Sequence, residues 1–253
     1  MVATRNDVNG ARRLDVMRVA VDALDEDQIG PTIDRLVEKP DVAQIVLIRW
    51  WDFMRARRDR EYRACLRDAD LVLPVSRSVS GAARFLRGRR PPRYMPFDFV
   101  IRTLGALEDR SRSIYLLGGT AQSLRTVEQN LRETFPGLRL VGRYTGNYGR
   151  QLEGDIITAI RKATPDFVLI GPGAPAGDRW VSRHRKQLSP SIFLHVPEVF
   201  DVFAERRRRG SRTAFRRGLD FVPDLVRRPW RALRFFVYLW FLVLLAIFKL
   251  FRL

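Results

Sequence analysis

Short apolar runs alternate with amphipathic stretches along most of the chain, which is the hydropathy pattern of an α/β protein. Runs rich in aliphatic and β-branched residues predict strands at 14–21, 43–48, 71–73, 114–117, 138–141, 165–170 and 192–196. Apolar positions at helical spacing predict helices at 25–38, 50–66, 79–86, 97–107, 124–131 and 156–160, and a basic helix opening at Trp180. Strands that alternate with helices predict an α/β fold, a parallel sheet with helices on both faces.

The clearest single unit runs from residue 113 to residue 148. Its first apolar run stops at Gly118 and Gly119, and Thr120 is placed to cap the helix that follows. Strand, glycine turn, helix and strand make a βαβ unit. Paired glycines let a ligand approach the backbone, and the helix N-terminus behind them offers free amides to a phosphate. The alternative is that the two glycines only make a tight turn.

Three predicted strands end in unusual loops, at 118–119, 144–148 and 171–178. In open parallel sheets ligands bind beyond the carboxyl ends of the strands. The last loop, GPGAPAGD, is rich in both glycine and proline. We expect a backbone-lined pocket for a nucleotide-sugar here, although plain turns would explain each loop singly. The candidate binding residues are Gly118, Gly119, Tyr144, Tyr148, Gly173, Pro175 and Asp178.

The charge balance is unusual, since 46 Lys and Arg residues face 28 acids and the formal net charge is +18. Such a balance indicates an anionic partner: nucleic acid, anionic lipid or a phosphorylated substrate. No nucleic-acid motif accompanies the arginines, so nucleic acid is not expected. The single cysteine, Cys65, excludes an internal disulfide and is expected to be buried. Two histidines and one cysteine argue against a His/Cys metal site, and no cofactor is expected.

The C-terminal part of the chain predicts a membrane attachment. Residues 205–234 contain eleven arginines and three acids, and 235–248 carry no charge. We expect 235–253 to anchor the protein, with the arginines on the cytoplasmic side. Fourteen uncharged residues fall short of the about 20 that span a bilayer, so spanning, lying in the interface and packing as a core helix all stay open. The residues expected at the membrane are Arg227, Arg228, Arg231, Phe235, Trp240 and Phe248.

These divisions predict a flexible segment at 1–13, an α/β domain at 14–204, an Arg-rich appendage at 205–234 and the hydrophobic helix at 235–253. Residues 1–13 contain no apolar run, so no secretory signal is expected there.

A series of short motifs runs through the chain in a fixed order. They are ADLVLP at 69–74, RYMPFD at 93–98, YLLGG at 115–119, PDFVLIGPGAPAGDRW at 165–180 and GLDFVPDLVRRPWR at 218–231. With these motifs residues 14–231 resemble the WecG/TagA/CpsF glycosyltransferases. The resemblance implies a Rossmann-like core that needs no metal. It also implies transfer of a hexose, typically N-acetylmannosamine, from a UDP-sugar donor to a lipid-linked amino-sugar acceptor at the inner face of a bacterial membrane.

The chain departs from the family's pattern at several loops. Val75 stands where the family has the Asp to which the general-base role is assigned. The family's Thr-x-Asn strand end falls on Leu47 and Arg49, and its Gly-Gly pair falls on Pro197 and Glu198. A valine cannot accept a proton. Two hypotheses follow: an active hexosyltransferase, or a non-catalytic relative that acts as a scaffold or regulator of polysaccharide assembly, either of them monomeric or oligomeric.

Five other residues could carry the chemistry. Arg93 and Asp98 match the family's pattern and are the tentative catalytic residues, with Arg93 suited to holding a pyrophosphate. Asp68 and Asp70 form an Asp-x-Asp pair, but they close a helix before a strand, which favours a structural role. His195, at a strand's carboxyl end, could act as a base near neutral pH, although a half-buried histidine with no role in catalysis is more common.

Overall fold

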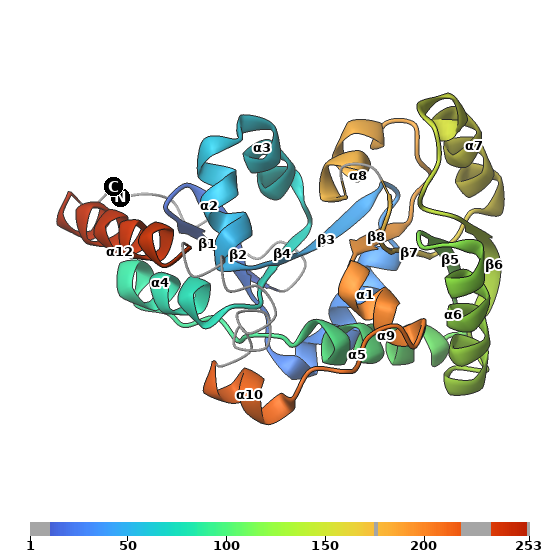
Figure 1. Cartoon of the computed structure of the whole chain (residues 1–253), viewed down its shortest axis with the longest axis horizontal. Helices are drawn as coiled ribbons and strands as arrows, with labels where there is room; N and C mark the ends of the chain where they lie inside the picture. The colour runs from blue at the N-terminus through green and yellow to red at the C-terminus, as the bar shows by residue number, and fades with distance from the viewer. Residues whose placement is uncertain (1–10, 175–176, 219–233, 252–253) are drawn as a thin grey trace.

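The computed structural model describes residues 11–174, 177–218 and 234–251, and a six-stranded parallel sheet lies at its centre (Figure 1). The strand order is β4-β3-β8-β7-β5-β6, and every neighbouring pair is parallel. The strands are β3 (Ala43–Ile48), β4 (Leu71–Pro74), β5 (Ser113–Leu117), β6 (Arg139–Tyr144), β7 (Phe167–Ile170) and β8 (Ile192–His195). This is the predicted α/β, Rossmann-like sheet, and the βαβ unit at β5 and β6 is confirmed.

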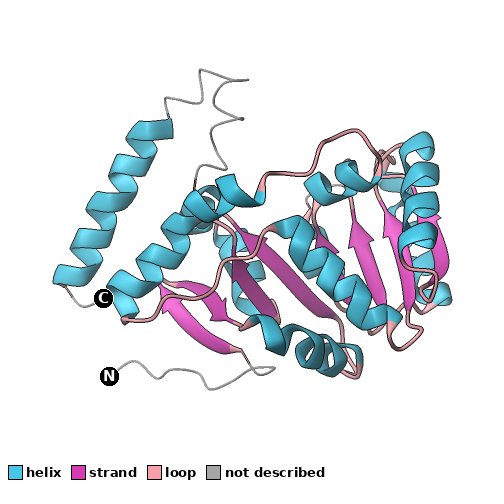
Figure 2. Ribbon diagram, turned by 90° about the horizontal axis from the view of Figure 1, so that it is seen from below, coloured by secondary structure: helices cyan, strands magenta, loops and turns pink. Residues whose placement is uncertain are grey.

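Helices cover both faces of the sheet, because strands buried on both sides need apolar partners above and below (Figure 2). One face packs against α1 (Ile29–Val37), α5 (Pro96–Glu108), α6 (Ala121–Thr134) and α9 (Pro197–Phe203). The other face packs against α2 (Trp50–Arg58), α3 (Arg60–Asp68), α4 (Arg77–Arg87), α7 (Glu153–Ala163) and α8 (Asp178–His184). The short helices η1 (Glu26–Gln28), η2 (Arg150–Leu152) and α10 (Arg212–Arg217) connect or extend these layers.

The strand predicted at 14–21 was wrong, because the chain reverses in the middle of it. The structure has an antiparallel hairpin of β1 (Arg12–Val16) and β2 (Val19–Ala23) instead. Met17 and Arg18 form its turn, with φ of 53° and 66°. Two-residue hairpin turns of this kind usually carry Asn or Gly, so Met17 and Arg18 carry no turn signal.

The helix predicted at 50–66 is divided into α2 and α3 at Asp59. This residue is extended, with φ −102° and ψ 107°, and its carboxylate accepts a hydrogen bond from the Tyr62 amide at 3.0 Å. The Asp59 side chain caps the N-terminus of α3, and this favours an extended backbone at Asp59 over continuation of α2.

The terminal helix α12 (Arg234–Leu250) lies against α4 and α2 at one end of the molecule. Its inner face buries Phe241, Leu245 and Phe248, and the Phe241 ring meets Phe53 edge-on at 5.9 Å between ring centroids. Trp240 on its outer face is 51% exposed, and most of its apolar neighbours there are similarly open. One side of the helix therefore packs as a core helix, which was one of the predicted alternatives. Its other side is exposed apolar surface.

In the described part of the chain, no helix combines the length and the apolarity needed to cross a membrane. Arg227, Arg228 and Arg231, expected at the membrane, lie outside the described residues, as does the side chain of Phe235.

The β1–β2 hairpin is fixed to the edge of the sheet by one buried carboxylate. Asp22 is 2% exposed and pairs with Arg13 at 2.8 Å. Its other oxygen accepts a hydrogen bond from the Val72 amide of β4 at 2.6 Å. The Arg13 guanidinium also donates to the Ala69 carbonyl at 2.8 Å, so a single ion pair ties the hairpin to both α3 and β4.

Replacing this carboxylate should cost a large part of the protein's stability. We expect Asp22→Asn to lower the free energy of unfolding by about 3 kcal/mol, because it leaves the Arg13 guanidinium buried and uncompensated. Urea denaturation of both proteins measures the difference. The matched control is Asp68→Asn, which breaks an exposed pair with Arg67 and should change stability by less than about 1 kcal/mol. Equal effects of the two substitutions would contradict the anchoring role of Asp22.

Candidate active site

The helices diverge at the carboxyl edge of the sheet, and this opens the place where a ligand is expected. After β3 and β7 the chain turns to α2 and α8 on one face, whereas after β5 and β8 it turns to α6 and α9 on the other. In folds of this kind a ligand-binding crevice is expected above strand ends whose connections leave in opposite directions, and we refer to this place as the crevice.

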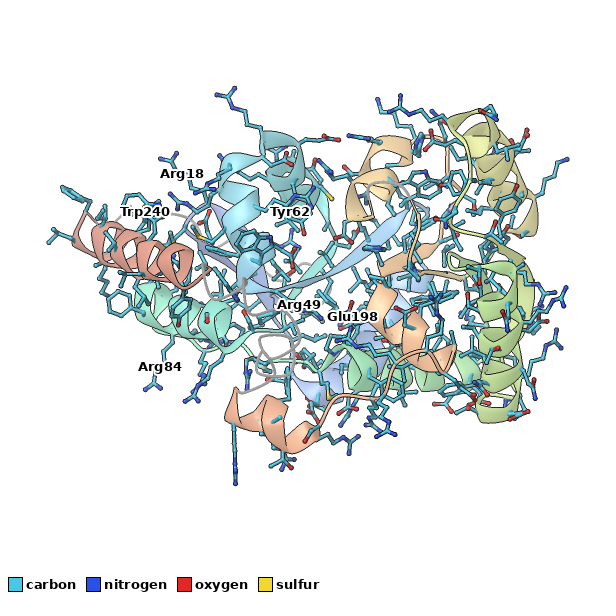
Figure 3. All side chains as sticks on the ribbon, in the orientation of Figure 1. Arg18, Arg49, Tyr62, Arg84, Glu198 and Trp240 are labelled. Carbon is cyan, nitrogen blue, oxygen red and sulfur yellow. The ribbon has the colours of Figure 1, made fainter. Side chains whose placement is uncertain are left out.

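Five charged or polar side chains from three strand ends meet in this crevice, and we call them the central cluster: Arg49, Asp52, Asp178, His195 and Glu198. Arg49 follows β3, Glu198 lies in the first turn of α9 after β8, and the two form an ion pair across the adjacent strands (Figure 3). The Asp52 carboxylate accepts a hydrogen bond from the Arg49 amide at 3.2 Å and so fixes the start of α2.

Asp178 enters the cluster as the first residue of α8. Its carboxylate Oδ1 lies 3.9 Å from Nδ1 of His195, and its backbone carbonyl accepts a hydrogen bond of 2.8 Å from the Gln44 side chain of β3. Gly177 before it has φ +52°, and a Cβ there would lie 2.6 Å from Cε1 of His195. A glycine is therefore required where the loop passes directly over the imidazole.

Burial sets the protonation states of the cluster. It raises the pKa of Asp178 to about 7, with a further contribution from the nearby negative charge of Asp52. Burial also raises the pKa of Asp52, although the Arg49 amide opposes this. It lowers the pKa of His195 to about 4, so this imidazole is neutral at neutral pH. The cluster thus contains a carboxylate that exchanges a proton near neutrality beside a neutral histidine, which is what general acid–base catalysis needs.

The glycine turn after β5 differs from the expectation of free amides. The Gly118 amide donates to the Tyr144 carbonyl at 2.9 Å, and the Gly119 amide donates to the Pro172 carbonyl at 2.7 Å. A Cβ on Gly118 would lie 2.6 Å from Cα of Gly171. Close packing explains why both positions are glycine: Gly118 faces the backbone of Gly171, and Gly119 faces the side chains of Ser123 and Phe200.

The other predicted donor-binding residues lie in the same group of loops. The rings of Tyr144 and Tyr148 meet edge-on at 6.2 Å between centroids. The Tyr148 hydroxyl is buried without a hydrogen-bond partner among the described residues. Gly173 is exposed and packs its backbone on the Asn147 side chain. Pro175 lies outside the described residues.

The family model "Glycosyl transferase WecG/TagA/CpsF family" matches residues 14–253. The chain belongs to this family. It is 24% identical over 178 residues to the N-acetylglucosaminyldiphosphoundecaprenol N-acetyl-beta-D-mannosaminyltransferase of Bacillus subtilis (strain 168), an alignment that covers 70% of this chain and 68% of that protein. It is 19% identical over 154 residues to the enzyme of the same name from Staphylococcus aureus (strain NCTC 8325 / PS 47), covering 61% and 60%.

The WecG/TagA/CpsF motif residues Arg93 and Asp98 lie away from the central cluster, at α10. Asp98 is paired with Arg209 and Arg212, and the Arg93 guanidinium donates to the Phe215 carbonyl at 2.9 Å and stacks on the Phe215 ring. Asp98 lies in the first turn of α5 and Arg93 in the loop before it, and α5 packs on the sheet face opposite to α8. The structure therefore brings these two residues to one short helix and does not bring them to Asp178.

Two further positions concern the departures from the WecG/TagA/CpsF pattern. Val75, at the expected position of the base, is 3% exposed, and its amide donates to the Ile48 carbonyl at 2.9 Å. Of the Asp-x-Asp pair, Asp70 is buried and bound by Lys39 and Arg185, whereas Asp68 is exposed. The two carboxylates lie in different environments and do not face one common site. This agrees with the structural role predicted for the pair. Cys65 is buried, as predicted.

Sequence reasoning missed the central cluster as a unit. Arg49 and Glu198 were noted only as departures from the family, and Asp52 was not noted. Asp178 was assigned to donor binding alone. The one available signal was that both departures are charged, with opposite signs, at the ends of two predicted strands.

The raised pKa of Asp178 should make stability depend on pH. In the folded state this pKa is about 7, above the about 3.9 of an unfolded Asp. Between these values the folded state binds more protons, so wild-type stability falls as pH rises. An Asn does not ionise. The stability of Asp178→Asn relative to wild type should therefore increase by up to about 4 kcal/mol from about pH 4 to about pH 7.

Urea denaturation of both proteins across this pH range measures the difference. The matched control is Asp155→Asn on the exposed side of α7, whose difference from wild type should stay flat. A flat difference for Asp178→Asn as well would show that its carboxyl titrates in its ordinary range.

Proposed function

We propose that the protein transfers an N-acetylmannosamine-type hexose from a UDP-sugar to a lipid-linked acceptor that carries N-acetylglucosamine on a diphosphate. The family match and the printed activity of its relatives support this reaction class. The observation that carries the proposal is Asp178: a carboxylate with a pKa of about 7, in the crevice at the carboxyl edge of the sheet.

In the proposed step the acceptor hydroxyl oxygen attacks C1 of the donor hexose. The bond from C1 to the phosphate oxygen breaks, UDP leaves with the electron pair, and Asp178 takes the proton of the hydroxyl. A base whose pKa lies near the working pH suits this transfer. His195, whose Nδ1 lies 3.9 Å from the Asp178 carboxylate, is neutral and adds no positive charge there, so it does not lower the pKa of Asp178.

The donor is proposed to bind beside the cluster, over the loops that follow β5, β6 and β7. Tyr144 and Tyr148 offer aromatic surface for a base, and the unpartnered Tyr148 hydroxyl offers a hydrogen bond. Gly173 contacts the side chain of Asn147, which lies between the two tyrosines in the sequence, and Asp178 of the central cluster follows five positions later. Gly118 and Gly119 are proposed to contribute shape, because their amides are already bonded.

Arg93 and Asp98 are proposed as positioning residues. Both hold α10, one at each end, so their loss should move this helix before it affects a proton transfer. The cavity of about 300 Å³ beside them, lined by Arg90, Arg93 and Arg216 among others, would then change shape.

A second candidate function is a non-catalytic relative that regulates polysaccharide assembly. Two observations favour it: Val75 is buried at the expected base position, and the Arg49–Glu198 ion pair bridges the crevice. Sugar transfer by the purified protein separates the two candidates, because a scaffold would show none.

The Asp178→Asn variant should transfer sugar at least about 100-fold more slowly than wild type, while it still binds UDP. The wild-type rate should rise with pH and reach half its maximum near about pH 7. The measurement is transfer from UDP-N-acetylmannosamine to a lipid-linked N-acetylglucosamine diphosphate, with UDP binding followed by calorimetry. Asp155→Asn is the control and should keep the wild-type rate.

Each other outcome overturns one part of the proposal. Wild-type rates in Asp178→Asn would exclude Asp178 as the base. Heat from UDP binding without any transfer by wild type would favour the non-catalytic relative. Absence of UDP binding would exclude a UDP-sugar as the donor.

We also propose that α12 holds the protein at a membrane surface by its outer face. The exposed apolar side chains there are Leu239, Trp240, Leu242, Val243, Ile247, Leu250 and Phe251. A continuous apolar patch of this kind is uncommon on monomeric proteins and marks an interaction site. Because the inner face is part of the core, deletion of the helix would uncover Phe53, so substitutions on the outer face are the cleaner test.

Polar substitution of the outer face should release the protein from lipid. We expect Trp240→Ser with Leu250→Ser to lower the partition onto neutral vesicles about 30-fold, since about 2 kcal/mol of apolar burial is lost. Val141→Ser with Leu152→Ser changes two exposed apolar residues at the other end of the sheet and should leave the partition unchanged. Vesicle sedimentation measures both. Equal partition of the α12 variant and wild type would contradict this attachment.

A further inference from the structure

A second, strongly basic cavity lies apart from the candidate active site. It has a volume of about 600 Å³ and lies between the β1–β2 hairpin, α3 and the end of α4. Eight of its thirteen lining residues are arginines, and Asp15 is the only acid among them. Of the described residues that line it, none belongs to a loop that follows one of the six parallel strands.

Most of this positive charge is not neutralised within the described part of the protein. Arg13, Arg67 and Arg87 each lie near a carboxylate. No described carboxylate pairs with the other five, which are Arg12, Arg18, Arg60, Arg63 and Arg89. Like charges held together in one cavity repel one another. An anion bound among them would relieve that repulsion.

Two of these arginines are held in place by the backbone around them. The Arg63 guanidinium donates to the carbonyls of Ala56 and Arg57, at 2.9 and 2.6 Å, so it stays at the end of α2. Arg18 occupies the hairpin turn with φ +66°, and its amide donates to the Asp15 carboxylate at 2.8 Å. A glycine would fit this left-handed turn with less strain, yet the turn presents an arginine.

The cavity adjoins the apolar helix α12. The guanidinium of Arg57, at the end of α2, lies 5.0 Å from the ring centre of Phe248 of α12, and the ammonium of Lys249 lies 5.6 Å from that of Phe85 in α4. The pKa of Arg57 is lowered, first by burial and then by the positive charges of Arg63 and Arg18. Arg57 therefore lies close to these two cavity arginines. Figure 3 shows Arg18 and Trp240 at the same end of the molecule.

We propose that this cavity binds the phosphate-bearing headgroup of an anionic membrane lipid. Guanidinium groups bind phosphate oxygens in pairs, and several of them suit a group with more than one negative oxygen. The volume suits a whole headgroup better than a lone ion. A bilayer that takes up the outer face of α12 brings such headgroups to the cavity. The inference rests on the proposed membrane association and is independent of sugar transfer.

The test compares vesicle binding of charge-matched variants. In the cavity variant, Arg60→Gln with Arg89→Gln, the partition onto vesicles containing phosphatidylglycerol should fall about 30-fold, because each arginine at an anionic surface contributes about fivefold. The control, Arg125→Gln with Arg161→Gln, removes the same charge from exposed positions on α6 and α7 and should stay within about threefold of wild type. On neutral phosphatidylcholine vesicles all three proteins should bind equally.

Circular dichroism confirms that each variant is folded, and Arg60→Lys with Arg89→Lys should restore only part of the binding, because lysine restores the charge without the paired guanidinium hydrogen bonds. Equal losses in the cavity and control variants would overturn the proposal, since general charge would then explain the binding. A second outcome would also overturn the proposal. If millimolar pyrophosphate stabilised wild type but not the cavity variant, and the two proteins bound vesicles equally, the site would serve a soluble phosphate instead of a lipid. Failure of wild type to bind neutral vesicles would refute the attachment through α12, and the phosphatidylglycerol comparison would still decide on the cavity.

Discussion

The backbones that leave β5 and β7 touch at Gly118 and Gly171, and the shape of the carboxyl edge depends on this contact. Neither position has room for a side chain, because Gly118 faces Gly171 and Gly171 faces the ring of Phe200. The Gly146 amide donates to the Gly119 carbonyl at 2.9 Å, so a third loop joins the same unit. With its beginning fixed in this way and its end held by Gln44, the loop after β7 delivers Asp178 to the crevice.

Two opposite charges at the ends of neighbouring strands compensate one another in space. Arg49 follows β3 and Glu198 follows β8, and they neutralise each other there. A single charge of either kind would be costly in a partly buried crevice. Glu198 also contributes to the raised pKa of Asp178.

Charge is distributed unevenly over the molecule. The crevice gathers carboxylates although arginines dominate the chain as a whole. The cavity lined by eight arginines lies near α12, where the apolar surface is also exposed. This separation lets an anionic surface be attracted at one end of the protein without neutralising the acids at the strand ends. Repulsion of a carboxylate-rich site from anionic lipid would otherwise oppose attachment.

The sequence by itself determined the sheet, because runs such as 43–48 and 167–170 are apolar on both faces and have no other stable place than a covered parallel sheet. It also determined the family, through motifs whose order survives divergence. Tertiary structure alone decided that Asp59 ends one helix by capping the next, and that Met17 and Arg18 turn the chain without a glycine.

The site depended still more on tertiary structure. The Asp178 carboxyl has an ordinary pKa in an extended chain, and this pKa rises to about 7 only when folding buries the group beside Asp52 and His195. Arg49 and Glu198 lie 149 positions apart, so no local pattern announces their ion pair. The sequence fixes which groups are present, whereas desolvation and the approach of distant strand ends, which exist only in the folded protein, decide what those groups do.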